Sequence, residues 1–160
     1  MGYTTDFSGK FKINKKVDDA TYTLLVGLST TRRMKRSGLD EKVYGIDGEF
    51  YCEDTEDLGQ QHEPSKGKIV DYNTPSRTQP SLWCHWAIQE DRQTIVWDGG
   101  EKFYEYRKWI VYLINKVLRP RKYVVNGKVE WIGEDSFNDQ GVITVKNNIV
   151  TIKIIKGERL

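Results

Sequence analysis

The chain has 160 residues, of which 38% are hydrophobic and 12% aromatic; this composition excludes a disordered protein and fits a single domain, residues 1–160. Its 25 Lys and Arg residues nearly balance 23 Asp and Glu residues, and the net charge of +2 excludes a general attraction to nucleic acid or anionic membranes. No apolar run approaches the ~20 residues of a membrane span, and no signal peptide follows Met1, so we expect a cytoplasmic protein without membrane contact.

Residues 7–13 alternate between apolar and polar side chains, which predicts a strand with one solvated basic face. Apolar residues at helical spacing then predict a helix over residues 20–35, with Asp18 and Asp19 offering the N-cap. Gly27 lies inside this helix, where a glycine costs ~1 kcal/mol relative to alanine.

Residues 38–80 are mostly polar, with weak periodicity, and we interpret them as an excursion from the core. Two short apolar pieces within residues 43–52 flank Asp47-Gly48, a dipeptide suited to a type I′ turn, which predicts a small hairpin. The acidic and polar residues 53–65 predict a loop.

Residues 81–88 and 94–97 alternate around a polar turn, which predicts an antiparallel hairpin rich in tryptophan. Asp98 follows, and with Glu101 it resembles a capping box for a helix over residues 101–118 that Pro120 stops.

Two further hairpins are predicted after this helix. Asn126-Gly127 separates two apolar runs within residues 123–132, the strongest short-range signal for a hairpin turn. Asn147-Asn148 separates residues 142–145 from residues 149–155 in the same way. Since helices interrupt groups of antiparallel strands, we expect an α+β fold with two main helices packed on one face of a mostly antiparallel sheet built from hairpins.

Several blocks of the sequence resemble small uncharacterised proteins of tailed phages and bacteria. These blocks are residues 1–9, 32–36, 81–86, 97–104 and 126–135. The resemblance implies an accessory gene carried by a phage or another mobile element. It carries over no catalytic residue, because the group has no established activity.

Six basic residues are candidates for binding phosphate or nucleic acid. They are Arg32, Arg33, Lys35, Arg36, Arg121 and Lys122. The first four lie at the predicted end of the first helix, where they could neutralise phosphates or interact with the helix dipole. The other two follow the second helix, and the two clusters form one patch only if the helices are parallel.

Trp83, His85, Asp98 and Tyr104 are candidates for an aromatic contact surface or pocket near the tryptophan-rich hairpin. An exposed Trp83 beside His85 could stack on a base or anchor a protein partner, although aromatic residues on strands also serve as core. An acid, a base and a phenol together suggest a hydrolase, but no nucleophile elbow or phosphate-binding loop accompanies them. We therefore predict no catalytic residues.

Two cysteines and two histidines are enough in number for a zinc site. Their order, Cys52, His62, Cys84 and His85, matches no zinc-finger spacing, so we expect free thiols and no metal or cofactor. Taken together, these features favour a non-enzymatic accessory protein that binds a host protein. The alternative is a nucleic-acid or nucleotide-binding module that uses the basic cluster and exposed tryptophans.

Overall fold

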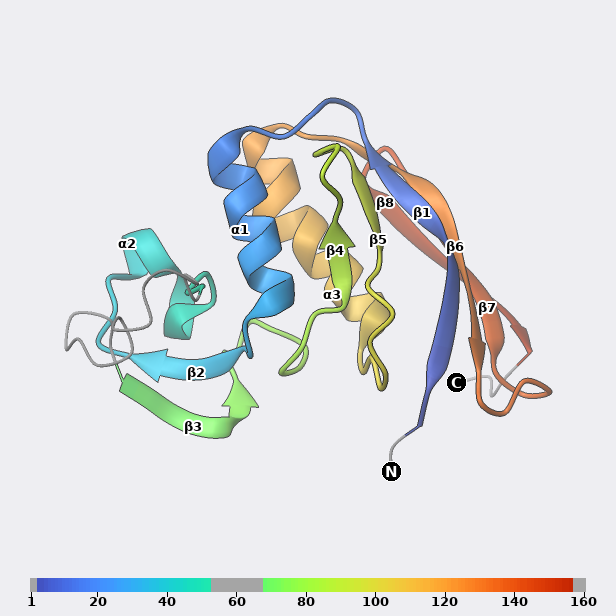
Figure 1. Ribbon diagram of the computed structural model, residues 1–160, viewed down its shortest axis with the longest axis horizontal. Helices are drawn as coiled ribbons and strands as arrows, with labels where there is room; N and C mark the ends of the chain where they lie inside the picture. The colour runs from blue at the N-terminus through green and yellow to red at the C-terminus, as the bar shows by residue number, and fades with distance from the viewer. Residues whose placement is uncertain (1–2, 53–67, 157–160) are drawn as a thin grey trace.

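A computed structural model describes residues 3–52 and 68–156 (Figure 1). The predicted loop at residues 53–65, with His62, lies outside these residues. In the described chain the strands form a six-stranded sheet, in the order β4-β5-β1-β6-β7-β8, and a two-stranded sheet of β2 and β3. The strand pairs in both sheets are antiparallel, which confirms the prediction of a mixed helix and sheet fold with a mostly antiparallel sheet.

The first strand and the start of the first helix are confirmed. Strand β1 spans Thr5–Ile13 and helix α1 spans Asp19–Thr30. The Asp18 carboxylate accepts a hydrogen bond from the Thr21 amide at 2.8 Å, as expected of an N-cap. Gly27 has a packing reason to be glycine, since a Cβ there would overlap the side chain of Cys52.

The predicted end of this helix, at residue 35, is wrong. Helix α1 stops at Thr30, and the chain becomes strand β2 (Met34–Ser37), so the first basic cluster does not lie on a helix. The Ser29 and Thr30 hydroxyls both donate to the Val26 carbonyl, a side-chain interaction that competes with the helical ladder. The Arg33 amide then donates to the Leu82 carbonyl at 2.7 Å.

The hairpin predicted at residues 43–52 is also wrong. A short helix α2 (Glu41–Tyr44) and a 3₁₀ turn η1 (Ile46–Gly48) occupy this segment. The Glu49 carboxylate accepts from the Ile46 amide at 3.0 Å and closes the chain into a compact turn instead of two strands. Strand β3 (Lys68–Pro75) returns and pairs with β2.

The tryptophan-rich hairpin is confirmed in a shorter form, as β4 (Trp86–Ile88) and β5 (Thr94–Trp97). The helix after it begins later than predicted. It comprises α3 (Tyr106–Tyr112), a π-helical turn η4 (Leu113–Leu118) and a 3₁₀ turn η5 (Arg119–Arg121). Lys102 and Glu105 have φ angles of 60° and 58°, which break a helix at residues 101–105. Asp98 is therefore not its N-cap.

The hairpin predicted around Asn126-Gly127 is wrong, because both residues lie inside one long strand, β6 (Val125–Gly133). All nine residues of β6 pair with β1, and Gly127 lies opposite Phe11. A Cβ on Gly127 would lie 2.8 Å from the Phe11 Cα and closer still to the Lys10 carbonyl oxygen. The glycine thus allows β1 and β6 to approach closely. Pairing with β1 decides the conformation of Asn126-Gly127, although the local sequence favours a turn.

The last hairpin is confirmed as β7 (Gln140–Lys146) and β8 (Ile149–Lys156). Asn147 and Asn148 turn between them with φ angles of 49° and 69°, as a type I′ turn requires.

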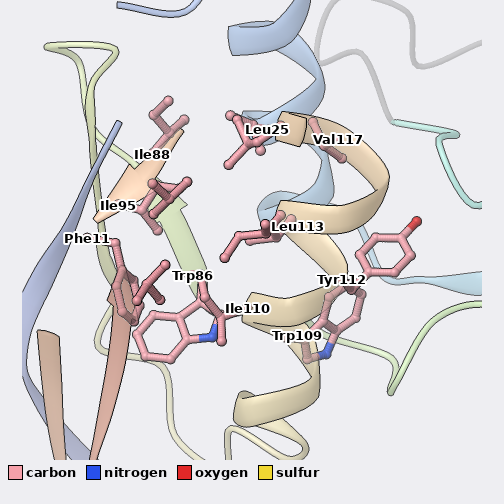
Figure 2. Close-up of a cluster of buried hydrophobic side chains, with 14 of the residues drawn as sticks. Phe11, Leu25, Trp86, Ile88, Ile95, Trp109, Ile110, Tyr112, Leu113 and Val117 are labelled. Atoms are coloured by element: carbon pink, nitrogen blue, oxygen red, sulfur yellow. The ribbon is translucent and has the colours of Figure 1, made fainter. Parts of the chain in front are cut away.

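The hydrophobic core contains side chains from the six-stranded sheet and from the helices α1 and α3 (Figure 2). Phe11, Trp86 and Ile95 project from the strands, and Leu25 and Leu113 meet them from the two helices. All five are at most 3% exposed, and a fully buried side chain of this size contributes about 1.5–3 kcal/mol to folding. None of the helices in the described chain has the length and apolar character needed to cross a bilayer.

Candidate functional site

A pocket of about 450 Å³ opens beside the start of the tryptophan-rich hairpin, and we call it the Trp83 pocket. Three segments form it: the end of β3, the chain leading into β4, and the chain between β5 and α3. Its lining includes Asn73, Pro75, Trp83, His85, Lys102 and Tyr104. Volumes of 300–1,000 Å³ are typical of small-molecule sites.

The Trp83 pocket brings together three of the four aromatic-site candidates. Trp83 is 38% exposed and Tyr104 is 53% exposed, although large aromatic side chains usually bury most of their surface. His85 lines the same pocket, and the Asp98 carboxylate bonds to its Nδ1. The four residues are therefore neighbours in space, which the sequence alone could not establish.

His85 is held rigidly by its surroundings. Its Nδ1 atom lies 3.0 Å from both carboxylate oxygens of Asp98. The Asp98 amide donates to the His85 carbonyl at 3.0 Å, which continues the β4–β5 pairing by one step. Phe103 packs edge-on against the imidazole at 5.1 Å, and a Cβ on Gly100 would overlap the ring at Nδ1 and Cε1.

The Asp98 carboxylate also accepts from the Gly100 amide at 2.7 Å. This local turn uses the carboxylate that the sequence suggested for a helix cap. Because a carboxylate only accepts, the Asp98 side chain places the imidazole proton on Nδ1. Nε2 makes no hydrogen bond within residues 3–52 and 68–156, and the Nε2 side of the ring remains for a ligand.

Ser81 fixes the two exposed aromatic residues to the core. Its Oγ lies 3.3 Å from the carbonyl oxygens of both Trp83 and Tyr104 and accepts from the buried Trp109 indole at 2.7 Å. The wall of the pocket is therefore anchored to helix α3. Ser81 was not predicted, and a serine between Pro80 and Leu82 gives no signal of this role in the sequence.

The basic residues at 32–36 do not form one solvated patch. Arg33 is 2% exposed and Arg36 is 5% exposed. Arg33 donates to the Tyr51 carbonyl, and its Nε and Nη1 have no hydrogen-bond partner among the residues that the structure describes. Lys35 is half-buried on β2, opposite Asp71. Arg33 precedes β2, and the pairing of β2 with β3 shifts in register on both sides of Lys35, so tertiary contacts and not a helix end decide where these side chains lie.

Arg32 lies next to the Trp83 pocket. Its guanidinium donates to the Tyr72 carbonyl at 3.0 Å and to the Asn73 side chain at 3.2 Å, and Asn73 lines the pocket. A cation thus lies at the rim. Lys102 adds a second cation and Glu101 an anion to the lining.

Arg121 and Lys122 lie at the opposite end of the helices. The Asp18 amide, at the start of α1, donates to the Tyr123 hydroxyl at 2.9 Å. The end of the second helix therefore meets the start of the first, and Figure 1 shows α1 and α3 running in opposite directions. The two basic clusters do not merge.

Sequence reasoning missed a buried polar network around Glu49. Glu49 is 2% exposed, and its carboxylate accepts from the Tyr112 hydroxyl at 2.7 Å and the Thr78 hydroxyl at 2.8 Å. Lys116 lies 3.6 Å from the same carboxylate. Tyr112 and Lys116 are 63 or more positions from Glu49, and Thr78 lies in a polar segment. No local pattern in the sequence therefore indicates this network.

Both cysteines are free thiols in the structure. Burial raises the pKa of Cys84 to about 12. Burial also raises the pKa of Cys52, although nearby Arg33 lowers it in part. Over the described ranges, no group of three or more His, Cys, Asp and Glu side chains is placed to hold a metal ion.

No protein-family model, curated protein or solved structure matches the chain.

Proposed function

We propose that this protein is a binding module and that the Trp83 pocket takes a flat heteroaromatic ring, the base of a nucleoside or of a single-stranded nucleic acid. The observation that carries the proposal is the exposure of Trp83 and Tyr104 in one pocket that also contains an oriented histidine. Stacking on an aromatic side chain is worth about 1–3 kcal/mol per base. Polar groups fix the orientation of a ligand in such sites.

The charges around the pocket favour a base over a polyphosphate. Lys102 and Glu101 together leave the lining without net charge. Arg32 at the rim supports a single phosphate that follows a base held inside the pocket. The other basic candidates contribute little, because Arg33 and Arg36 are buried and Arg121 and Lys122 are at the far end.

A titration of the protein with adenosine, followed by calorimetry, tests this proposal. The Trp83→Ala variant should bind roughly 5–150-fold more weakly, which is the loss of one stacking contact. Tyr72→Ala is the matched control, because Tyr72 is 64% exposed on β3 and does not line the pocket. Absence of binding to the wild-type protein, or equal losses in both variants, would contradict the proposal.

Binding of a host protein is the second candidate, and a different surface favours it. Strand β8 is an edge of the six-stranded sheet, and Ile149, Ile154 and Ile155 on it are 65%, 41% and 52% exposed. A groove of about 270 Å³ beside it, between α3 and β8, carries Arg107 and Lys108 over apolar residues. An acidic, extended segment of a host protein suits this edge, because it can add a strand and meet the two cations.

This second candidate is tested with a synthetic acidic peptide of alternating apolar and Glu residues. Binding should weaken as salt rises and should fail in an Arg107→Glu, Lys108→Glu double variant. An unchanged affinity in the double variant would remove the candidate. The role as a phage or mobile-element accessory protein, cytoplasmic in its host, rests on the resemblance of the sequence blocks.

Both candidates treat the chain as one domain with α1 and α3 packed on one face of the six-stranded sheet. Contacts of the two helices with β4, and the shared core of Figure 2, support this arrangement.

A further inference from the structure

The tautomer of His85 determines whether the imidazole presents a hydrogen-bond donor or an acceptor to a base in the Trp83 pocket. Asp98 faces Nδ1 with both carboxylate oxygens at 3.0 Å, so in the neutral imidazole Nδ1 carries the proton and Nε2 is a hydrogen-bond acceptor. Gly100 covers the Nδ1 and Cε1 side of the ring. The His85 side chain is 17% exposed and lines the pocket, and Nε2 is not among the buried polar atoms that lack a partner in the described chain.

We infer that His85 selects ligands whose ring carries an amino or N–H donor in its plane, as adenine does, over rings that lack one. The inference rests on the proposed function of the Trp83 pocket and names the class of base that the pocket takes. Phe103 and Asp98 hold the imidazole ring in place, and no described residue bonds to Nε2. A ligand in the pocket can therefore supply the hydrogen-bond partner of that nitrogen.

The rigidity of His85 makes this selection effective. A histidine that could rotate or change tautomer would present a donor or an acceptor as the ligand required. Here the ring is fixed by the carboxylate, by the edge contact with Phe103 and by the close approach of Gly100. A ligand that faces Nε2 with an acceptor leaves two acceptors opposed, and a ligand without a polar group leaves Nε2 unpaired.

Asp98→Asn is the informative variant, because it removes the feature that fixes the proton on Nδ1. The Gly100 amide donates to one Asp98 oxygen at 2.7 Å, so the carbonyl oxygen of an asparagine stays there and the amino group replaces the other oxygen. Both positions lie 3.0 Å from Nδ1, so the asparagine can accept from Nδ1 or donate to it. The imidazole can then carry its proton on either nitrogen, and Nε2 can present a donor or an acceptor.

The test compares adenosine with purine riboside, which is the same nucleoside without the amino group, in a mildly alkaline buffer. The wild-type protein should bind adenosine about 5-fold more tightly, the value of one hydrogen bond. Asp98→Asn should reduce this preference, because both tautomers of His85 are then available. Asp19→Asn is the control, because Asp19 is an exposed carboxylate paired with Arg92 on another part of the surface.

Nitrogen-15 NMR of His85 in the free protein reads the tautomer without a ligand. It should show the proton on Nδ1 in the wild-type protein and a larger fraction with the proton on Nε2 in Asp98→Asn. Equal binding of the two nucleosides, or a proton on Nε2 in the wild-type protein, would overturn the inference and leave the proposed function standing. If neither nucleoside binds, the proposed function fails, and the inference fails with it.

Discussion

Replacement of Gly127 by alanine tests the least expected feature of the fold, the passage of Asn126-Gly127 through the middle of strand β6. Gly127 has φ = 148°, a conformation that L-residues rarely adopt, and holding one there costs about 1–3 kcal/mol. The new Cβ would also lie 2.8 Å from the Phe11 Cα and closer to the Lys10 carbonyl oxygen. Both atoms belong to the backbone of β1, so they cannot rotate away.

The free-energy cost of the steric overlap adds to the cost of the strained backbone conformation. Overpacking of this kind costs about 1–3 kcal/mol, so the variant should lose about 4 kcal/mol in total. Natural proteins have only about 5–15 kcal/mol of stability. At about 2–4 °C per kcal/mol for a chain of this length, we expect the Tm to fall by about 8–16 °C.

Gly99→Ala is the matched control for this experiment. Gly99 has φ = 86°, and apart from its chain neighbours no atom of the described residues lies within 4 Å of the position that its Cβ would occupy. Its substitution therefore carries the backbone strain without the steric overlap, about 1–3 kcal/mol. Thermal unfolding followed by circular dichroism measures both variants. If Gly127→Ala is no less stable than Gly99→Ala, the close approach of β1 and β6 is refuted.

Three further predictions concern the buried polar groups. Glu49→Ala should destabilise the protein by about 3–5 kcal/mol in urea unfolding, because it removes the buried carboxylate that satisfies Tyr112 and Thr78. Arg77→Ala should cost less than about 1 kcal/mol, because the Arg77 side chain is 67% exposed in its ion pair with Asp47. Ser81→Ala should cost about 1–3 kcal/mol by leaving the Trp109 indole without its acceptor, and a wild-type urea midpoint would contradict this. The folded-state pKa of Cys84 is raised from 9.0 to about 12, so its contribution to stability is present below about pH 9 and is lost as the pH rises toward 12. Cys84→Ala should flatten the fall in Tm across that window, and an unchanged slope would exclude Cys84 as a source.

Sequence reasoning predicted the elements whose signals are local and periodic. Strand β1, the N-cap at Asp18 and the β7–β8 hairpin around Asn147-Asn148 follow from alternation, capping chemistry and turn chemistry. These features depend on residues a few positions apart. The sequence therefore contains their physical cause within a short window.

The errors occur where a distant partner decides the outcome. Gly127 is opposite Phe11, more than 100 residues away, and that pairing converts a turn signal into a strand. Asp98 is occupied by His85 and Gly100, so it is not available to cap a helix. Arg33 is drawn into the interior beside Tyr51, which the density of positive charge in the sequence does not indicate.

The proximity of four candidate residues follows from their place near one hairpin in the sequence. Trp83, His85 and Tyr104 line one pocket, and Asp98 bonds to His85. The rest of that pocket was not predictable, because Asn73 arrives through the pairing of β3 with β2 and Ser81 acts through a contact with α3.

The most direct test of the Trp83 pocket as a base-binding site is an NMR titration of the protein with adenosine, in which the tryptophan indole N–H signals report on separate regions. If the pocket binds a base, the signals of Trp83 and His85 should shift with saturation, while that of the buried Trp131, whose indole donates to Asp139, stays in place. Shifts confined to other residues, or no saturable shift at Trp83, would contradict it.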